Sequence, residues 1–424
     1  MITIIFFAYN IIKVFILRRS IVLIQRKEYF DKLIGYKDKK IIKVITGIRR
    51  CGKSTLLKLF EEYLLNNGVL ENQITFINFE DYEFDDLKDP KQLYKYIKER
   101  LVKDKNNYLL LDEIQNVKDF QKVIDSFFIK DNIDIYITGS NAHMLSGELA
   151  TLLSGRYVKI EMLPLSFSEY VSVINNPNAS VEQLYKEYIE TSSFPYVLNL
   201  EKKNNQIKEY LNSIYDTVIL KDVIARKKIS DVMMLESVMR FLMDNIGNQL
   251  STKKISDTMT SNGRKISVRN VENYISAFME SYIIYEAKRY DIRGKQYLKT
   301  LEKYYIVDIG LRNAMLGNSG RDVGHILENV IYLELIRRGY EVYIGKIDDV
   351  EVDFVARDEN GIKYIQVAAT VRDEKTLARE LRPLQKIHDH YPKCILTLDM
   401  DPIADYEGIR KINALEFLLH KVEL

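Results

Sequence analysis

Residues Lys43–Leu57 read Lys-Val-Ile-Thr-Gly-Ile-Arg-Arg-Cys-Gly-Lys-Ser-Thr-Leu-Leu, an apolar run, a loop with two glycines and the start of a helix. Four residues, Gly47, Gly52, Lys53 and Ser54, match the phosphate-loop pattern G-x-x-x-x-G-K-[ST]. In this pattern the glycines let backbone N–H groups close on phosphates, the lysine reaches the β and γ oxygens, and the serine holds Mg²⁺. The helix adds the positive end of its dipole. The stretch therefore predicts a triphosphate site between a strand and a helix.

Two adjacent carboxylates follow a later apolar run, Tyr108 to Leu111. Asp112 and Glu113 would lie at the carboxyl end of that strand, the edge at which parallel sheets bind ligands. We expect Asp112 to join the Mg²⁺ shell through Ser54 and water. Glu113 is placed to orient and polarise the water that attacks the γ-phosphate, so Glu113 and Lys53 are the first two predicted catalytic residues.

Two further polar residues are candidates for the γ-phosphate. Asn141 follows the strand Ile133 to Thr138 and would sense hydrolysis, although a capping role for the next helix fits the same position. Arg156 directly precedes the strand Tyr157 to Glu161. It is predicted either to reach a γ-phosphate, in its own or a neighbouring subunit, or to make a surface salt bridge.

The first 165 residues alternate strands with helices, a pattern typical of βαβ units in a doubly wound α/β sheet. A lead-in helix is expected over Ile24 to Lys39, before the phosphate-loop strand. The predicted strands are Ile41 to Thr46, Ile74 to Phe79, Tyr108 to Leu111, Ile133 to Thr138 and Tyr157 to Glu161.

Four stretches carry a family resemblance. They read Gly-Ile-Arg-Arg-Cys-Gly-Lys-Ser-Thr-Leu-Leu from residue 47, Leu-Leu-Leu-Asp-Glu-Ile-Gln from residue 109, Ile-Thr-Gly-Ser-Asn-Ala-His-Met-Leu-Ser-Gly-Glu-Leu-Ala-Thr-Leu-Leu-Ser-Gly-Arg from residue 137 and Leu-Pro-Leu-Ser-Phe-Ser-Glu-Tyr from residue 163. Together they resemble a prokaryotic AAA-superfamily P-loop ATPase with a C-terminal domain of unknown function. The resemblance implies ATP and Mg²⁺ as ligands, and a sheet in which the phosphate-loop strand lies beside the sensor strand, with the Asp-Glu strand beyond. The predicted nucleotide-binding residues are Gly47, Arg50, Cys51, Gly52, Lys53, Ser54 and Thr55, and the predicted metal residues are Ser54 and Asp112.

Residues 166–235, which follow the predicted ATPase core of residues 24–165, resemble the helical lid that closes over nucleotide in such ATPases. A longer amphipathic helix is expected from Gln206 to Lys228. Its Arg226 either touches nucleotide from the lid side or, as we favour, forms a salt bridge with Asp222 one turn earlier.

Residues 236–315 resemble a winged helix-turn-helix. Ser267 is a plausible N-cap, and an apolar stripe marks the core face of the helix that follows. Basic residues nearby would lay the helix in a major groove and the wing on phosphates, or they form a solvated or protein-contacting face. The stripe comprises Val271, Tyr274, Ile275, Phe278, Met279 and Tyr282, and the basic residues are Arg264, Lys265, Arg269, Lys288, Arg289, Arg293 and Lys295.

Residues 316–424 follow the element order of the restriction-endonuclease-like fold. In its nucleases an acidic residue on the first helix, an Asp on the second strand and an acidic-x-Lys on the third strand bind Mg²⁺ and activate water. Glu328 and Asp353 stand at the first two places, but Gln366 and Ala368 replace the acid and the lysine. A neutral amide is a poor ligand for a hard cation, and alanine cannot assist a water. We expect a degenerate domain used for binding or assembly rather than a nuclease.

Composition sets the remaining expectations. The 424 residues carry 62 Lys and Arg against 60 Asp and Glu, so any nucleic-acid surface must be local. Two cysteines make no disulfide framework, which favours the cytoplasm. Residues 1–23 are apolar, but Asn10 and Lys13 interrupt a run shorter than a bilayer span, so we expect a non-essential extension rather than an anchor, and no stable membrane insertion.

These patterns predict an ATPase that hydrolyses ATP to ADP and phosphate and passes the nucleotide state to the winged-helix and C-terminal domains, with DNA as a candidate partner. Two alternatives stay open: a nucleotide-controlled DNA nuclease, and a non-hydrolysing ATP- or ADP-binding switch or scaffold. The expected partners are ATP or ADP, DNA through the winged helix, and a second copy of the chain or a protein partner.

Overall fold

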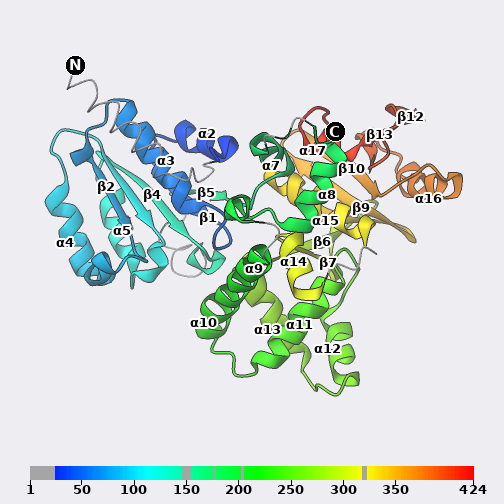
Figure 1. Ribbon diagram of the computed structural model, residues 1–424, viewed down its shortest axis with the longest axis horizontal. Helices are drawn as coiled ribbons and strands as arrows, with labels where there is room; N and C mark the ends of the chain where they lie inside the picture. Colours follow the sequence, from blue (N-terminus) through cyan, green and yellow to red (C-terminus); the bar gives the residue numbers. More distant parts are fainter. Residues whose placement is uncertain are drawn as a thin grey trace.

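The computed structural model describes residues 24–145, 153, 155–174, 176, 178–201, 205–317 and 322–424. Figure 1 shows three parts: a sheet with flanking helices near the N-terminus, a second sheet near the C-terminus, and helices that lie below and between them. The apolar extension predicted over residues 1–23 lies outside the described residues.

The N-terminal sheet is a five-stranded parallel sheet whose strands lie within one residue of the predicted bounds. The strands are β1 (Ile42–Thr46), β2 (Ile74–Asn78), β3 (Asn107–Asp112), β4 (Ile133–Gly139) and β5 (Tyr157–Glu161). Their order is β2-β3-β4-β1-β5, and every neighbouring pair is parallel. The phosphate-loop strand β1 therefore lies beside β4, with the Asp-Glu strand β3 beyond, which confirms the predicted order.

Helices cover both faces of this sheet because its strands are apolar on both sides. Every residue of β1, β3 and β4 is buried. One hydrophobic core joins one face to α4 and α5, and a second joins the other face to α2 and α3. This is a doubly wound α/β arrangement. The helices are α2 (Lys27–Gly35), α3 (Lys53–Asn66), α4 (Pro90–Arg100) and α5 (Phe120–Phe128).

The middle of the chain is mainly helical. The long helix predicted over Gln206 to Lys228 is helical throughout, but its second half is a π-helix, η6 (Val218–Ile224), which the sequence pattern did not indicate. None of the helices in the described part of the chain is both long and apolar enough to cross a bilayer. The α-helices of this middle region are α7 (Phe167–Val173), α8 (Val181–Thr191), α9 (Gln206–Thr217), α10 (Ala225–Lys227), α11 (Val232–Asp244), α12 (Thr252–Ser261), α13 (Val268–Glu280) and α14 (Ile309–Leu316).

The core face predicted for α13 is confirmed. Ser267 caps the helix by accepting a hydrogen bond from the backbone N–H of Asn270. The predicted apolar stripe packs inward, with Met279 partly buried and the other five side chains buried.

The second sheet has eight strands and joins two of the predicted domains. Its strands are β6 (Ile284–Asp291), β7 (Gln296–Ile306), β8 (Glu341–Ile347), β9 (Val350–Asp358), β10 (Gly361–Ala368), β11 (Lys393–Thr397), β12 (Ala404–Tyr406) and β13 (Ile409–Asn413). Their order is β12-β13-β11-β10-β9-β8-β6-β7. The remaining helices are α15 (Val323–Arg337), α16 (Glu374–Gln385) and α17 (Ala414–Leu418).

The hairpin β6–β7, predicted as the wing of a separate domain, is an edge of this sheet. β6 pairs in parallel with β8 at Arg289 to Asp291. The predicted boundary between residues 315 and 316 therefore does not separate two sheets. The largest hydrophobic core also runs without a break from the ATPase helices through the middle region to the C-terminal sheet. The parts of the molecule are thus packed as one body rather than strung on linkers.

Candidate functional site

The loop between β1 and α3 has the backbone that a phosphate loop requires. Gly47 has φ 145° and Gly52 has φ 107°, a region that favours glycine. A Cβ atom on Gly47 would lie 2.1 Å from the carbonyl oxygen of Met162, so no side chain fits there. The helix begins at Lys53, directly after Gly52. The first turn of α3 therefore presents its N–H groups toward the loop.

Lys53 and Glu113 link the loop to the end of β3. The Lys53 ammonium donates to the carbonyl oxygens of Gly47 at 3.0 Å and Ile48 at 3.2 Å, and lies 3.4 Å from Glu113 Oε1. Burial opposes the lysine's charge, but the carboxylate of Glu113 raises the pKa of Lys53 above its usual value. The ammonium of Lys53 in turn lowers the pKa of Glu113, although burial acts in the opposite direction. Glu113 is therefore held ionised, as a group that accepts a hydrogen bond from water must be.

Asp112 lies fully buried at the end of β3. Its Oδ1 accepts a hydrogen bond from the Thr138 hydroxyl at 2.5 Å, whereas its Oδ2 is buried and has no hydrogen-bond partner among the described residues. Burial raises the pKa of Asp112, and the hydroxyls of Thr138 and Ser54 oppose that rise. An unpaired buried carboxylate oxygen costs free energy unless a cation or water completes it. The position fits the predicted metal shell.

Glu113 is fixed by its neighbours. Its φ of 55° is left-handed, a strained conformation for a residue with a Cβ. Its backbone N–H donates to the Thr138 hydroxyl at 2.9 Å, and its Oε2 accepts hydrogen bonds from Ser140 at 3.0 Å and from Gln115. These contacts hold the Glu113 carboxylate at the carboxyl end of β3, beside β4.

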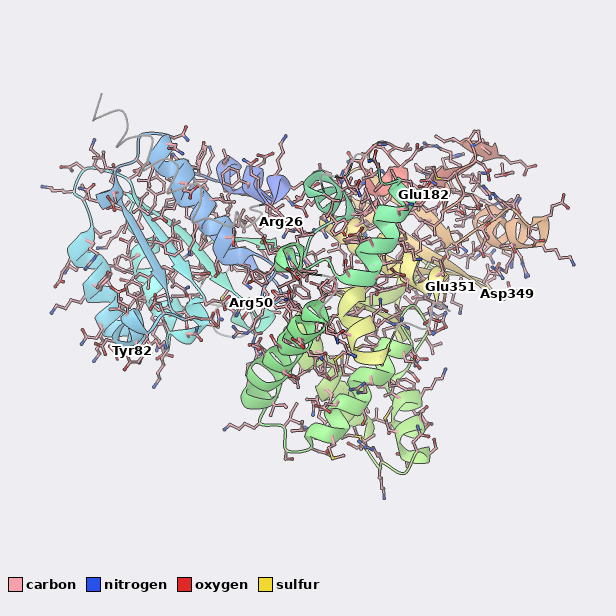
Figure 2. All side chains as sticks on the ribbon, viewed as in Figure 1. Arg26, Arg50, Tyr82, Glu182, Asp349 and Glu351 are labelled. Atoms are coloured by element: carbon pink, nitrogen blue, oxygen red, sulfur yellow. The ribbon has the colours of Figure 1, made fainter. Side chains whose placement is uncertain are left out.

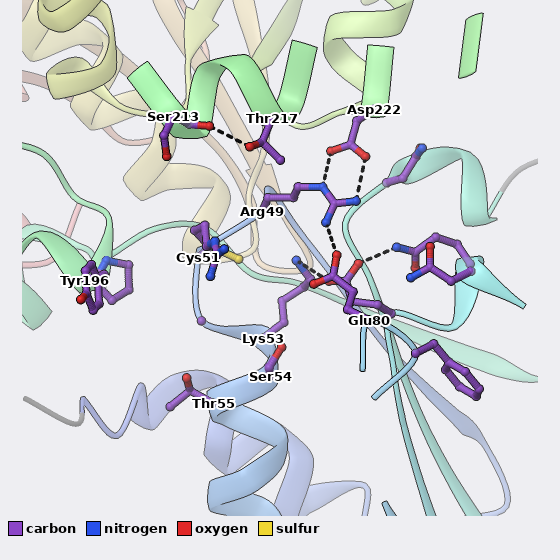
Figure 3. Close-up of a pocket in the computed structure, with 18 of the residues that line it drawn as sticks. Arg49, Cys51, Lys53, Ser54, Thr55, Glu80, Tyr196, Ser213, Thr217 and Asp222 are labelled. Atoms are coloured by element: carbon purple, nitrogen blue, oxygen red, sulfur yellow. Dashed lines mark hydrogen bonds and ion pairs between the residues drawn. The ribbon is translucent and has the colours of Figure 1, made fainter. Parts of the chain in front are cut away.

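A cavity of about 1160 Å³ lies in front of this strand edge. Figure 3 shows the loop residues along one wall and residues of α9 and η6, such as Ser213, Thr217 and Asp222, along the opposite wall. Asn141 lines it as well, so the position fits the sensor interpretation. The cavity is lined from the N-terminal part by Ile24, Arg26, Arg49, Arg50, Cys51, Gly52, Lys53, Ser54, Thr55, Phe79, Glu80, Lys88, Glu113, Gln115, Asn116 and Asn141. From the helical middle of the chain it is lined by Pro195, Tyr196, Asn199, Tyr210, Ser213, Thr217, Asp222 and Arg226.

Arg49 is a site residue that the sequence analysis missed. Its guanidinium donates to both carboxylate oxygens of Asp222, at 2.7 and 3.2 Å, and to Glu80 at 2.6 Å (Figure 3). Arg49 thus connects the phosphate loop to η6. The pattern G-x-x-x-x-G-K-[ST] leaves this position free. The only sequence signal was a second arginine inside the loop.

Arg226 does not form the salt bridge that we favoured. Both oxygens of Asp222 are engaged by Arg49, and the three guanidinium nitrogens of Arg226 are buried with no hydrogen-bond partner in the part of the chain that the structure describes. Burial lowers the pKa of Arg226, and Asp222 only partly opposes the shift. Arg226, on α10, lines the cavity. The arrangement fits the other interpretation, in which Arg226 meets an anion in the cavity.

Arg156 lies at the wrong edge of the sheet. β5 is parallel to β1 with Tyr157 opposite Ile42, so Arg156 lies where β1 begins, whereas Gly47 follows the end of β1. The five residues of β1 separate the two edges by roughly 16 Å at 3.3 Å per residue. The Arg156 side chain pairs with Asp125 instead. The prediction that it reaches the γ-phosphate of its own subunit is wrong, and contact with a neighbouring subunit stays a prediction.

The predicted degenerate nuclease residues do come together in the C-terminal part. Glu328 on α15 and Asp353 on β9 both lie at the ammonium of Lys303, at 2.9 and 3.7 Å. Gln366 on β10 accepts the backbone N–H of Asp353 at 2.7 Å and donates to Glu380 at 2.9 Å. Burial and the neighbouring Glu328 raise the pKa of Asp353 to about 8. Lys303, on β7, was not foreseen.

Comparison with known proteins assigns the N-terminal part to a described family. Residues 39–171 match a family described as "AAA domain", and residues 182–322 match a domain of unknown function. Among solved structures, the Walker-type ATPase of Pyrococcus abyssi has a TM-score of 0.49 at 16% identity, covering 69% of this chain and 95% of that chain. The ORC1 protein of Aeropyrum pernix in complex with DNA has a TM-score of 0.32 at 14% identity, covering 70% and 93%. The AAA match, the parallel sheet and the phosphate loop define a chain with a P-loop ATPase-type domain.

Two relatives span most of the chain. An uncharacterized protein of Haemophilus influenzae is 40% identical over 94% of this chain and 99% of its own length. An uncharacterized protein of Methanocaldococcus jannaschii is 31% identical over 88% of this chain and 84% of its own length. The chain belongs to the same family as these uncharacterized proteins.

Proposed function

We propose that this protein binds Mg·ATP in the cavity between the phosphate loop and the lid and hydrolyses it to ADP and phosphate. One observation carries the proposal. Two buried groups of opposite charge at this site, Asp112 Oδ2 and the Arg226 guanidinium, lack hydrogen-bond partners within the described residues. A cation would pair with the Asp112 carboxylate, and a phosphate would pair with the Arg226 guanidinium. Mg·ATP supplies both.

The protein would act mainly by positioning and charge stabilisation, as in phosphoryl transfer generally. Ser54 and Asp112 would hold Mg²⁺, which when bound neutralises charge on the phosphate oxygens. Lys53 would exchange its loop carbonyls for phosphate oxygens and release Glu113 toward the attacking water. Asn141 would contact the γ-phosphate from the end of β4, and Arg226 would approach it from the lid.

The far side of the cavity suits a base. Ile24, Pro195, Tyr196 and Tyr210 offer apolar and aromatic surface there. The rings of Tyr196 and Tyr210 lie 5.3 Å apart and tilted. Rings of this kind stack on a nucleobase without reading its edge in detail. The triphosphate would then extend toward Lys53.

Buried arginines support coupling between the nucleotide and the C-terminal domain. Arg26 donates to the Cys51 carbonyl oxygen in the phosphate loop at 2.9 Å and to the Leu163 carbonyl oxygen at 2.7 Å. Arg337, at the end of α15, donates to the Pro164 carbonyl oxygen and to the Tyr29 hydroxyl, both at 3.0 Å. Figure 2 shows Arg26 on the side of the ATPase part that faces the rest of the molecule. A movement of the phosphate loop on nucleotide binding would therefore be transmitted to α15.

ATP turnover by the full chain tests the proposal. Lys53→Ala is compared with Lys58→Ala, a control on the exposed face of the same helix. We expect Mg²⁺-dependent release of phosphate by the wild type and by Lys58→Ala, and loss of turnover in Lys53→Ala. Equal turnover in all three proteins would assign the activity to a contaminant and contradict the proposal.

A non-hydrolysing switch is the second candidate. It is favoured by the ion pair between Lys53 and Glu113, which keeps the predicted base engaged in this structure. A single-turnover experiment separates the two candidates. Bound ATP that stays intact for hours in the wild type, with and without DNA, would support the switch and exclude the ATPase.

DNA contact is proposed for α13 and the hairpin β6–β7. The exposed face of α13 carries Arg269, Asn270 and Asn273, while the hairpin residue Arg293 is paired with Asp348 at 2.7 Å. Phosphate contacts make binding fall steeply with salt. Duplex affinity measured at two salt concentrations, for the wild type and Arg269→Ala, tests this contact. Equal affinity in both proteins would remove α13 from it.

A further inference from the structure

We propose that Lys303 permanently fills the cation position of the C-terminal carboxylate cluster, which comprises Glu328, Glu351 and Asp353. The cluster would then be a metal-free clamp that fixes the hairpin β6–β7 to the C-terminal sheet. This inference is independent of the proposed ATPase activity, because the cluster lies outside the nucleotide cavity and on other elements.

The ammonium of Lys303 is surrounded by the three carboxylates. Its Nζ lies 2.9 Å from Glu328 Oε1, 2.7 Å from Glu351 Oε1 and 3.7 Å from Asp353 Oδ1. An ammonium group has three N–H donors and no acceptor, so it can donate to Glu328 and Glu351, while Asp353 adds a longer ion pair. Side-chain exposure of Lys303 is 5%, which leaves little room for a second cation beside it.

The carboxylates are held in place by further donors. The Tyr305 hydroxyl donates to Glu328 Oε1 at 2.7 Å, and the Val367 N–H donates to Asp353 Oδ2 at 2.9 Å. Gln249 donates to Glu351 Oε2. A buried ion cluster is tolerated when its remaining lone pairs are satisfied in this way. The cluster is thus complete without an added ligand.

The residues at the third nuclease place do not fit a metal. Gln366 uses its amide oxygen to accept the Asp353 N–H and its amide nitrogen to donate to Glu380. Mg²⁺ prefers carboxylate oxygens in near-octahedral geometry at about 2.0–2.1 Å, whereas Glu328 and Glu351 lie at hydrogen-bond distances from the Lys303 nitrogen and Asp353 lies at 3.7 Å. Within the described residues no group of His, Cys, Asp and Glu side chains is arranged to hold a metal ion. The Lys303 ammonium thus lies among the carboxylates that would hold a metal in the nucleases that residues 316–424 resemble.

The clamp joins elements that are far apart in the chain. Lys303 and Tyr305 come from β7, the edge strand of the sheet, while the carboxylates come from α15 and β9. Figure 2 shows Glu351 within the C-terminal part. Asn329 of α15 adds two hydrogen bonds to the backbone of Ile306, each 2.8 Å long. The cluster thus holds the start of the C-terminal domain against the hairpin that precedes it.

Binding of Mn²⁺ to the full-length, nucleotide-free protein tests the inference, measured by electron paramagnetic resonance. Lys303→Met keeps the length of the side chain but removes its charge, and Lys288→Met on the neighbouring strand β6 is the matched control. We expect Lys303→Met to bind one additional Mn²⁺ per chain, at least about tenfold tighter than any site in the wild type. That extra site should disappear in Lys303→Met/Asp353→Asn. A folded Lys303→Met without an added site would overturn the inference.

If Lys303→Met fails to fold, Mn²⁺ binding by the wild type and by Asp353→Asn still tests the inference. Identical Mn²⁺ titrations of these two proteins would support the inference, because the wild-type cluster then holds no metal. A wild-type Mn²⁺ site that Asp353→Asn removes would overturn it, and metal-dependent cleavage of DNA lost in the same variant would restore the nuclease.

Discussion

Lys53 and Lys303 are both buried beside carboxylates, and they differ in what surrounds them. Lys53 lies 3.4 Å from Glu113 at the wall of a cavity of about 1160 Å³, near groups that lack hydrogen-bond partners among the described residues. Lys303 lies between Glu328 and Glu351, whose oxygens also receive hydrogen bonds from neighbouring side chains. The first site borders a cavity and contains charged groups that are unpaired in the described part of the chain, whereas the second has its ammonium paired with carboxylates that also receive other hydrogen bonds.

The difference teaches how to separate a ligand site from a structural ion cluster. Both contain the residue types of metal-dependent chemistry, so residue identity does not distinguish them. Unpaired buried groups cost free energy that a ligand can recover, whereas satisfied groups have nothing to gain from one. We therefore assign ATP chemistry to Lys53 and a structural role to Lys303.

The largest effect is expected from Lys53→Ala on turnover. Loss of a charge aimed at the transferring phosphate should lower ATP turnover by at least about 100- to 1000-fold. Thermal unfolding should show that the variant remains folded, since Glu113 keeps its hydrogen bonds from Ser140 and Gln115. A variant that unfolds but retains turnover per folded molecule would place Lys53 in the structural class with Lys303.

Lys303→Ala is expected to give the opposite result. Removal of the ammonium leaves buried carboxylates without a counter-charge, which costs about 3–5 kcal/mol of unfolding free energy. ATP turnover per folded molecule should stay unchanged. Denaturant unfolding of this variant beside Lys288→Ala provides the measurement. A loss of turnover without a loss of stability would show that the comparison between the two lysines is mistaken.

Arg226→Ala tests the unpaired cation at the open site. A hydrogen bond to a charged group contributes about 1.5–3 kcal/mol, so ATP affinity should fall about 10- to 100-fold. Lys228→Ala, at an exposed position on the same segment, should bind ATP as the wild type does. Equilibrium binding of ATP and ADP to each protein gives the affinities. Unchanged ATP affinity in Arg226→Ala would mean that its guanidinium does not meet the phosphates.

Arg156→Ala should have the smallest effect. The side chain is 44% exposed and pairs with Asp125 at the edge of the sheet away from the loop. A surface ion pair contributes about 0–1 kcal/mol, and turnover at low protein concentration should change less than about twofold. A large loss of turnover that depends on protein concentration would instead point to contact with a neighbouring subunit.

Much of the ATPase core was predictable because its signals are local. The loop from Gly47 to Ser54 needs glycines at fixed spacing, and buried parallel strands such as β1 and β4 read as continuous apolar runs. Asp112 and Glu113 could be placed at the ligand edge of the sheet because they directly follow an apolar run that reads as a strand. Arg156 was misplaced although its signal was present, because a residue that precedes a parallel strand lies at the edge opposite the ligand.

The missed contacts join residues that are distant in sequence. Arg49 and Asp222 are 173 positions apart, and Lys303 and Glu328 are brought together by β7 and α15 of two predicted domains. Periodicity carries no information about such pairs, since it reports only which face of an element is apolar. The preferred Arg226–Asp222 pair failed because a partner from the phosphate loop engaged Asp222 instead.

Retention of radiolabelled ATP by Glu113→Gln tests the central claim most directly. The variant keeps the shape of the side chain but removes the charge that we assign to water activation. After removal of free nucleotide, we predict that Glu113→Gln retains intact ATP in the presence of Mg²⁺, whereas the wild type retains ADP or no nucleotide. Failure of both proteins to bind ATP, or hydrolysis by Glu113→Gln at the wild-type rate, would contradict the account.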